Sequence, residues 1–318
     1  MIEVKDLVKK YGSHLAVDHL SFTLESGKIY GFLGPNGAGK STTMNIMTGY
    51  LGATQGSVLI DGHDILKEPE EAKKHIGYLP ELPPLYMDMT VQEYLEFAAE
   101  LKKLPKEKRE SDISEVMKLT RLQDVSGRLI KNLSKGYKQR VGLAQAILGF
   151  PEIIILDEPT VGLDPKQIIE IRELIRTLSK KHTVILSSHI LAEVREVCDY
   201  ILIISKGKLV ASDTPENLEL LRNGASSLEL EVKAAPETAR AILSTIDDIN
   251  TMEMHIENEN LTRIKLETKN GADIREAVFY AFAEEKCPLL EMKTAKASLE
   301  DIFMELTQKE ESNDAGNL

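Results

Sequence analysis

The sequence predicts an α/β domain with a mainly parallel sheet, followed by a smaller α+β domain. The first domain is indicated by two short apolar runs, at residues 153–157 and 183–187, which have the length and composition of buried parallel strands. A helical pattern at residues 166–178 lies between the two runs. Because strand, helix and strand in that order are typical of a crossover connection, we expect both strands in one sheet.

Three further segments extend this pattern. Residues 29–33 are apolar and β-prone, and they lead through a glycine-rich turn into a helical stretch that begins at Lys40. Residues 57–60 predict a strand that ends at an Asp-Gly turn. Residues 91–103 have the apolar periodicity of a helix with one buried face. The first domain therefore reads as strands alternating with helices.

The character of the sequence changes at residues 222–227, which separate a predicted first domain, residues 1–222, from a second, residues 227–308. The expected elements of the second domain are strands at 228–232, 252–256, 261–266 and 289–292, and helices from Pro236, at 272–285 and from about Ser298. The order strand, helix, strand, strand, helix, strand suggests a ferredoxin-like fold. The polar tail at 309–318 is expected to be disordered.

Composition limits the classes of function. The chain has 318 residues, of which 42% are hydrophobic, and a formal net charge of -12. Broad contact with DNA or RNA needs a basic face, so no nucleic-acid partner is expected. The sequence contains no apolar run of about 18 residues that would span a membrane. Its two cysteines are far apart, which fits a reducing cytoplasm.

A glycine-rich loop joins the expected strand at 29–33 to the helix that follows. Its eight residues fit the P-loop pattern and are Gly34, Pro35, Asn36, Gly37, Ala38, Gly39, Lys40 and Ser41. Glycines let backbone N–H groups turn inward around phosphate oxygens, and the N-terminus of the following helix favours the same anion. We expect Lys40 to reach the β and γ phosphates, the Ser41 hydroxyl to ligate Mg²⁺ and Thr42 to donate to the α phosphate.

Two acidic residues, Asp157 and Glu158, end the apolar strand that begins at residue 153. A carboxylate at such a strand end can hold the water shell of Mg²⁺, which suits Asp157. Glu158 follows it and suits a general base acting on the water that attacks the γ phosphate. Taken alone, the pair fits solvated acids at a strand end equally well, and the upstream P-loop favours the metal and base roles.

The segment at residues 133–140 resembles the signature motif of ABC ATPases, usually written LSGGQ and followed by an arginine. Ser134 and Gly136, the positions most tied to phosphate contact in that family, are kept. Lys135 stands where the motif has a glycine, and Tyr137 where it has glutamine. Without the resemblance, Ser134 would be an ordinary helix N-cap, and a capped helix N-terminus can also receive a phosphate.

Four single residues also fall where ABC ATPases have a functional side chain. Tyr11 resembles the aromatic that stacks on adenine, Asp164 the D-loop aspartate and His189 the switch histidine. Glu81 stands where the family has the Q-loop glutamine. It would either offer Mg²⁺ a charged oxygen in place of a neutral one, or turn away to make a salt bridge that fixes the docking loop. Taken singly, Tyr11 would be read as a packing residue and His189 as an ordinary histidine. The resemblance covers residues 1 to about 220.

The resemblance implies an ATPase that binds ATP and Mg²⁺ and works as a head-to-tail dimer, either a homodimer or a heterodimer of ATP-binding subunits. Each ATP would lie between the P-loop of one subunit and Ser134 and Gly136 of the other, and Asp164 would also contact the nucleotide. Glu158 and His189 would be the catalytic residues. The γ phosphate would favour the closed dimer because it contacts both subunits, and hydrolysis would remove that preference.

A transporter of this kind also needs a polytopic membrane subunit, which would be a separate polypeptide and would hold this chain at the cytoplasmic face of the membrane. Residues 82–104 are the candidate docking surface, and a loop packed on its own helix explains them equally well. Residues 297–303 resemble the closing segment of an exporter branch that includes drug-resistance and gliding-motility transporters. The rival class is a soluble ABC ATPase that acts in translation, chromosome structure or DNA repair. Three features disfavour it: the single cassette, the lack of a long coiled-coil pattern, and the presence of only two cysteines.

Overall fold

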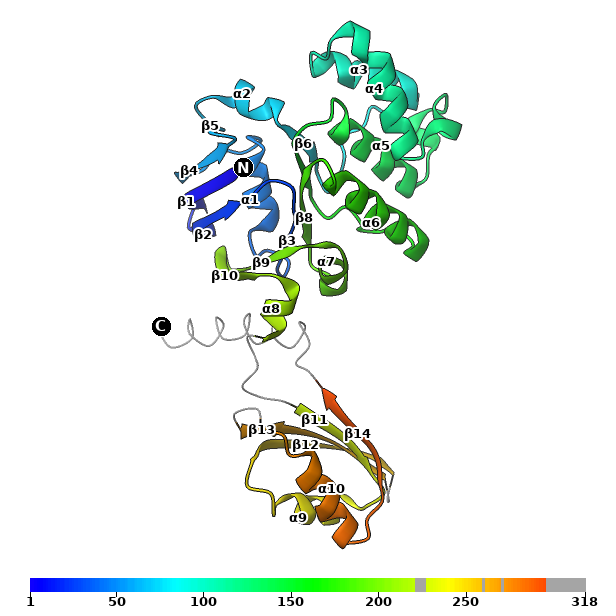
Figure 1. Cartoon of the computed structure of the whole chain (residues 1–318). Helices are drawn as coiled ribbons and strands as arrows, with labels where there is room; N and C mark the ends of the chain where they lie inside the picture. The colour runs from blue at the N-terminus through cyan, green and yellow to red at the C-terminus, as the bar shows by residue number, and fades with distance from the viewer. Residues whose placement is uncertain (221–226, 259–260, 270–271, 296–318) are drawn as a thin grey trace. The chain divides into compact units, whose positions relative to one another are not determined.

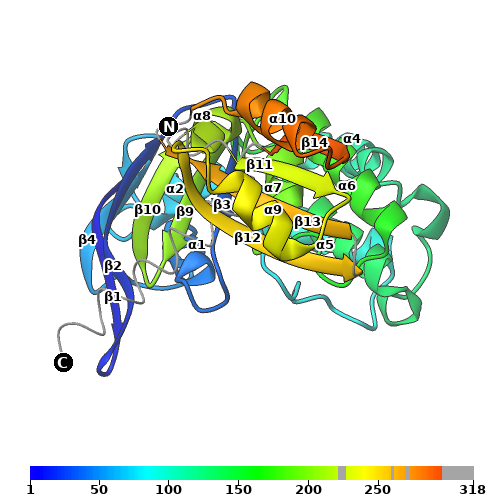
Figure 2. The ribbon, with the colours of Figure 1, turned by 90° about the horizontal axis from the view of Figure 1, so that it is seen from below.

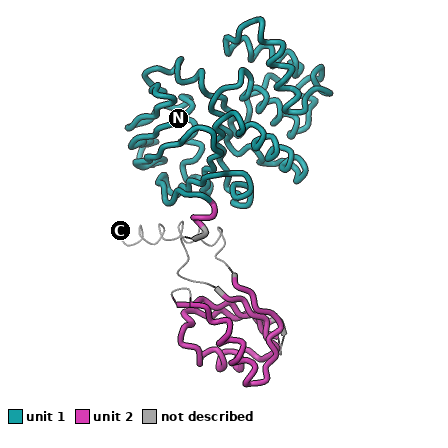
Figure 3. The backbone as a smooth tube through the Cα atoms, in the orientation of Figure 1, with its two compact units in different colours: residues 1–214 teal, residues 215–318 magenta. Residues whose placement is uncertain are grey.

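Helices and strands group into two units, residues 1–214 and 215–318 (Figure 3). The computed structural model describes residues 1–220, 227–258, 261–269 and 272–295 (Figure 1). The expected boundary near residue 222, the helix from about Ser298 and the tail at 309–318 lie outside the described residues. Among the residues described, no helix is both long and apolar enough to cross a membrane.

A six-stranded sheet in the order β10-β9-β3-β8-β7-β6 forms the centre of the first unit. All neighbouring strands are parallel except β10 and β9. The strands are β3 (Ile29–Leu33), β6 (Ile76–Leu79), β7 (Ile153–Leu156), β8 (Thr183–Ser188), β9 (Tyr200–Ser205) and β10 (Lys208–Asp213). The expected parallel pairing of β7 with β8 is confirmed, and helix α6 (Pro165–Ser179) connects them.

A four-stranded antiparallel sheet, in the order β2-β1-β4-β5, was not expected from the sequence. Its strands are β1 (Ile2–Tyr11), β2 (His14–Leu24), β4 (Gln55–Ile60) and β5 (His63–Asp64). The register of the β1–β2 hairpin shifts repeatedly between Val4 and Lys10. Such irregularities break the period of two that would have identified the strands from sequence. The expected strand at 57–60 is part of β4 in this sheet.

Helix α1 (Lys40–Met47) lies between the two sheets, as Figures 1 and 2 show. Its Met44 and Met47 are fully buried in one apolar cluster with side chains of both sheets, among them Leu20 and Phe32. Helices α6 and α7 (Leu191–Val197) cover the other face of the six-stranded sheet (Figure 2). Burial on both faces explains why the central strands read as continuous apolar runs.

A group of helices follows β6 along the chain. It contains α3 (Val91–Leu101), α4 (Lys106–Leu119), the short 3-10 helices η1 (Gln123–Val125) and η2 (Ile130–Asn132), and α5 (Lys135–Ile147). Helix α3, expected from its periodicity, begins at a capping box in which the Thr90 hydroxyl accepts from the Glu93 N–H. The remaining helices of the described part up to residue 220 are α2 (Pro69–Lys74) and α8 (Pro215–Leu220).

The second unit contains an antiparallel sheet in the order β12-β13-β11-β14. After α8, its described elements are β11 (Ser227–Val232), α9 (Pro236–Leu243), β12 (Ile249–Asn258), β13 (Leu261–Thr268), α10 (Arg275–Glu284) and β14 (Leu289–Ala295). Helices α9 and α10 pack on one face of the sheet, where Leu230, Ile242, Leu266 and Phe282 form part of its core (Figure 1). The expected order of elements, from the strand at 228–232 to the strand at 289–292, is therefore present.

We predict that Gly77→Ala destabilises the first unit by about 1–3 kcal/mol, because overpacking a close contact has costs of this size. Gly77 lies in β6, and an added Cβ would lie 2.1 Å from the Ala146 carbonyl oxygen on α5. Thermal unfolding measures the loss. Gly127→Ala is the matched control, since nothing lies within 4 Å of its added Cβ. Equal melting temperatures for the two variants would contradict this packing.

Candidate active site

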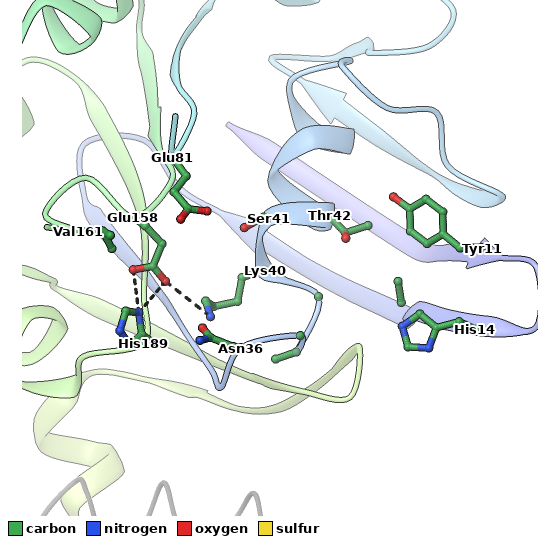
Figure 4. Close-up of a pocket in the computed structure, with 14 residues that line it drawn as sticks. Tyr11, His14, Asn36, Lys40, Ser41, Thr42, Glu81, Glu158, Val161 and His189 are labelled. Carbon is green, nitrogen blue, oxygen red and sulfur yellow. Dashed lines mark hydrogen bonds and ion pairs between the residues drawn. The ribbon is translucent and has the colours of Figure 1, made fainter. Parts of the chain in front are cut away.

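Most of the predicted site residues line one cavity of about 500 Å³ in the first unit. It lies where β3, β7 and β8 end, next to the N-terminus of α1 (Figure 4). The lining residues are Tyr11, His14, Ala16, Asn36, Gly37, Ala38, Gly39, Lys40, Ser41, Thr42, Glu81, Glu158, Val161 and His189. Clefts at the carboxyl ends of parallel strands are the usual ligand sites of α/β folds.

The loop between β3 and α1 has the backbone of a phosphate cradle. Gly37 and Gly39 have φ angles of 81° and 101°, in the region that favours glycine. At Gly39 an added Cβ would also lie 2.5 Å from the Ala16 carbonyl oxygen. Gly39 is the N-cap of α1 and provides no side-chain cap. The first N–H groups of α1 can therefore bind an anion.

The Lys40 ammonium group lies inside this loop. Its Nζ donates to the carbonyl oxygens of Gly34, at 2.7 Å, and Pro35, at 3.2 Å, and it lies 3.8 Å from Glu158 Oε1. Burial lowers the pKa of Lys40, while the nearby Glu158 and Asp157 carboxylates act in the opposite direction and favour the charged form. The structure thus places a nearly buried cation at the phosphate loop, balanced by carboxylates.

Asp157 joins the P-loop helix to the strand ends. Its Oδ1 accepts hydrogen bonds from the hydroxyls of Ser41, at 3.1 Å, and Ser187, at 2.6 Å. The Ser187 hydroxyl also accepts from the Glu158 N–H at 2.8 Å. A hydroxyl and a carboxylate side by side form the kind of oxygen donor set that Mg²⁺ prefers.

Glu158 and His189 contact each other at the edge of the cavity (Figure 4). His189 Nδ1 lies 3.1 Å and 3.0 Å from the two carboxylate oxygens of Glu158. The Glu158 side chain is only 9% exposed, whereas that of His189 is 41% exposed. Glu158 also has a φ of 47°, which is uncommon for a residue other than glycine. A nearly buried carboxylate that contacts an imidazole suits proton transfer.

Glu81 stands at the junction of two cavities. It lines the one described above and a neighbouring cavity of about 550 Å³ that also contacts Tyr50, Tyr78 and Leu82. Its carboxylate is among the charges that favour protonated Lys40. Burial raises the pKa of Tyr78, whose hydroxyl donates to the Asn45 side chain at 2.9 Å.

The hairpin of β1 and β2 provides the opposite end of the cavity. Tyr11 is about half exposed there, and Lys9 Nζ lies 5.2 Å from the centre of its ring. Sequence reasoning missed His14, which pairs with Tyr11 across the turn, as well as Ala16 and Val161. The sequence holds one signal for His14, its place three residues after Tyr11. That signal indicates a shared site only when residues 11 and 14 are known to pair across a hairpin turn.

Ser134, Gly136 and Asp164 do not line this cavity. Ser134 is the N-cap of α5 and accepts from the Tyr137 N–H at 3.4 Å; Asp164 is the N-cap of α6 and accepts from the Gln167 N–H at 2.9 Å. The two helix starts lie together, because an added Cβ at Gly136 would be 2.4 Å from the Gln167 side chain. These residues thus form a separate group.

Comparison with known proteins identifies the family. A family profile described as ABC transporter matches residues 17–161. The uncharacterized ABC transporter ATP-binding protein YhcH of Bacillus subtilis is 37% identical over 310 residues, which cover 96% of each chain. The bacitracin transport ATP-binding protein BcrA of Bacillus licheniformis is 35% identical, over 96% of this chain and 97% of its own. The linearmycin resistance ATP-binding protein LnrL of Bacillus subtilis is 30% identical, with 96% and 98% covered.

Solved structures with a similar fold belong to the same family. The ATP-binding subunit of an ABC transporter has a TM-score of 0.65 and 31% identity, covering 70% of this chain and 93% of that one. A dimeric ATP-binding cassette in a post-hydrolysis state, bound to ADP and Pi, has a TM-score of 0.62 and 26% identity, covering 67% and 98%. The chain belongs to the ATP-binding proteins of ABC transporters. It is an ATPase subunit of such a transporter, and cassettes of this family form dimers.

Proposed function

We propose that this chain powers export of a small molecule through a separate polytopic membrane subunit. The relatives named for bacitracin transport and linearmycin resistance match over 96% of the chain, which includes the described second unit. The observation that carries the ATPase assignment is the meeting of Lys40, Asp157, Glu158 and His189 at one phosphate loop. Hydrolysis at this loop would supply the energy for transport.

In the proposed site, ATP lies along the cavity with its base at Tyr11 and its phosphates in the loop at residues 36–42. Lys40 neutralises charge on the β and γ phosphates, and Thr42 donates to the α phosphate. The half-exposed Tyr11 ring, which lines the cavity, supports this placement, since aromatic rings stack on one another.

The donor set fits Mg²⁺ at the end of β7. Ser41 and Asp157 would hold the ion, and Glu81 would contribute a third oxygen from the adjoining loop. When bound, the ion neutralises phosphate charge. Lys40 balances the nearby carboxylates, which lowers their repulsion of the phosphates.

Glu158 is proposed as the general base and His189 as its partner. Glu158 accepts a proton from the water that attacks the γ phosphate. His189, whose Nδ1 lies against both carboxylate oxygens, orients Glu158 (Figure 4). Glu158 is nearly buried and lines the cavity, so its carboxylate can contact a water molecule held beside the phosphates.

Ser134, Gly136 and Asp164 are proposed to complete the site of a second subunit. They lie outside the chain's own cavity, and two helix N-termini meet at this surface. Helix N-termini favour anions, so a γ phosphate from another chain is a fitting ligand. The dimer is then head-to-tail and two-fold, and either two copies of this chain or a homologous subunit can form it.

The membrane subunit is proposed to bind the segment at residues 82–104 and to hold the chain at the cytoplasmic face of the membrane. Leu82, Tyr86 and Met87 are exposed there, beside the cavity that Glu81 shares. The second unit is proposed to be a ferredoxin-like domain. Its support is the order of its elements and its antiparallel sheet with both helices on one face.

Affinity purification from gently solubilised membranes tests the transport assignment. We expect a polytopic subunit to be recovered with the chain. A chain carrying Leu82→Ser and Tyr86→Ser should recover less of it while hydrolysing ATP normally, because exposed apolar contacts drive docking. Recovery of ribosomes or DNA-repair proteins in its place would favour the soluble ABC ATPase, the second candidate.

Glu158→Gln is predicted to bind ATP, hydrolyse it slowly and accumulate a dimer in Mg-ATP, because the base is lost while its shape is kept. Adding Ser134→Asp should abolish this dimer, since aspartate keeps the helix cap but repels the γ phosphate. Ser134→Asn is the matched neutral control and should dimerise. Size-exclusion chromatography with labelled ATP measures both properties. Equal dimerisation of the Asp and Asn variants would contradict a phosphate contact at Ser134.

A further inference from the structure

A nearly buried carboxylate outside the cavity, that of Glu193 on α7, joins separate segments of the first unit. The side chain is 7% exposed. Its Oε2 accepts hydrogen bonds from the hydroxyls of Thr160, at 2.6 Å, and Ser188, at 3.3 Å. Its Oε1 lies 3.9 Å from a guanidinium nitrogen of Arg172. Burial of a carboxylate costs free energy unless hydrogen bonds and opposite charge compensate it, and here all three partners contribute.

The two hydroxyl partners each lie next to a residue of the proposed catalytic pair. Thr160 is on the loop that follows Glu158, and Ser188 immediately precedes His189. The Glu193 carboxylate therefore connects the loop of the proposed base to the strand end of its proposed partner. Neither hydroxyl lines the cavity, so neither is expected to touch ATP.

Two consecutive serines at the end of β8 contact different parts of the loop network. Ser187 points to the Asp157 carboxylate and the Glu158 N–H, and Ser188 points to Glu193. One serine fixes the start of the loop after β7, and the other fixes its continuation through Thr160 and the shared carboxylate. Together with the hydrogen bond that the Gln139 side chain donates to the Pro159 carbonyl oxygen at 3.2 Å, these contacts hold the loop at three points.

Arg172 extends the network to α6, the helix that Asp164 caps. Its guanidinium also pairs with Glu196 on α7. The helix that begins at the proposed dimer surface is thus linked through the Glu193 carboxylate to both catalytic loops.

We propose that Glu193 is a positioning residue of the ATPase. It holds the loops of Glu158 and His189 at the separation that their contact requires, and through Arg172 it ties that separation to α6. The inference rests on the proposed catalytic roles of Glu158 and His189. Small displacements of reacting groups lower the rate of chemistry strongly while leaving substrate binding intact.

The test compares Thr160→Val with Thr160→Ser in the full chain. Valine keeps the shape and removes the hydrogen bond to Glu193; serine keeps the bond. We expect Thr160→Val to lower kcat about tenfold or more with KM for ATP within about twofold, and Thr160→Ser to retain parental values. Thr120→Val is the control for losing a buried hydroxyl, since Thr120 donates to the Val116 carbonyl oxygen at 2.7 Å, away from the cavity. It should lose stability and keep kcat.

A double-mutant cycle separates positioning from general destabilisation. If Thr160 acts through the contact between Glu158 and His189, the two changes are not independent. Combining Thr160→Val with His189→Ala should then lower kcat by much less than the product of the two single fold-changes. The proposal is overturned if Thr160→Val keeps parental kcat, if Thr120→Val loses as much, or if the effects are additive. Failure of the proposed catalytic roles gives a different result, because His189→Ala and Glu158→Gln would then each retain parental kcat.

Discussion

The hydrogen bonds of the Ser187 hydroxyl are the interaction on which the site depends. This group donates to Asp157 and accepts from the Glu158 N–H, so it locks the end of β7 to the end of β8. Asp157 in turn accepts from Ser41 on the P-loop helix. Two parallel-strand ends and the P-loop helix are therefore held in one geometry by one hydroxyl and one carboxylate. A cleft for phosphate forms there because parallel strands direct all their carboxyl ends to the same edge.

Charge balance follows from this arrangement. Lys40 is nearly buried, and desolvation alone would favour its neutral form. The carboxylates of Glu158, Asp157 and Glu81 act against this desolvation and favour the charged form. The glutamate at position 81 therefore adds a further carboxylate to a site that must still accept the negative charge of ATP. That extra charge is consistent with a metal-binding role, since an added carboxylate without a cation would oppose substrate binding.

Local sequence was sufficient for the parts of the site that are local. The P-loop and the acids after β7 are short contiguous patterns flanked by strands and helices. The structure brings Glu158 into the cavity of the P-loop and joins Asp157 to that loop's helix through Ser41. The β1–β2 hairpin and its His14 could not be predicted, because register shifts hide the strand periodicity. Glu193 could not be predicted either. A glutamate on a helix is normally solvated, and its partner Thr160 is 33 residues away in the chain.

The central claim is that one chain holds half of each catalytic site. Mixing two inactive variants tests it most directly: Lys40→Ala, with a broken P-loop, and Ser134→Asp, with a broken signature. In a mixed dimer the intact P-loop of one chain faces the intact signature of the other. Equimolar mixing should then recover about a quarter of parental ATPase activity, because half of the dimers are mixed and each contains one complete site. No recovery, with mixed dimers demonstrated by cross-linking, would contradict the account.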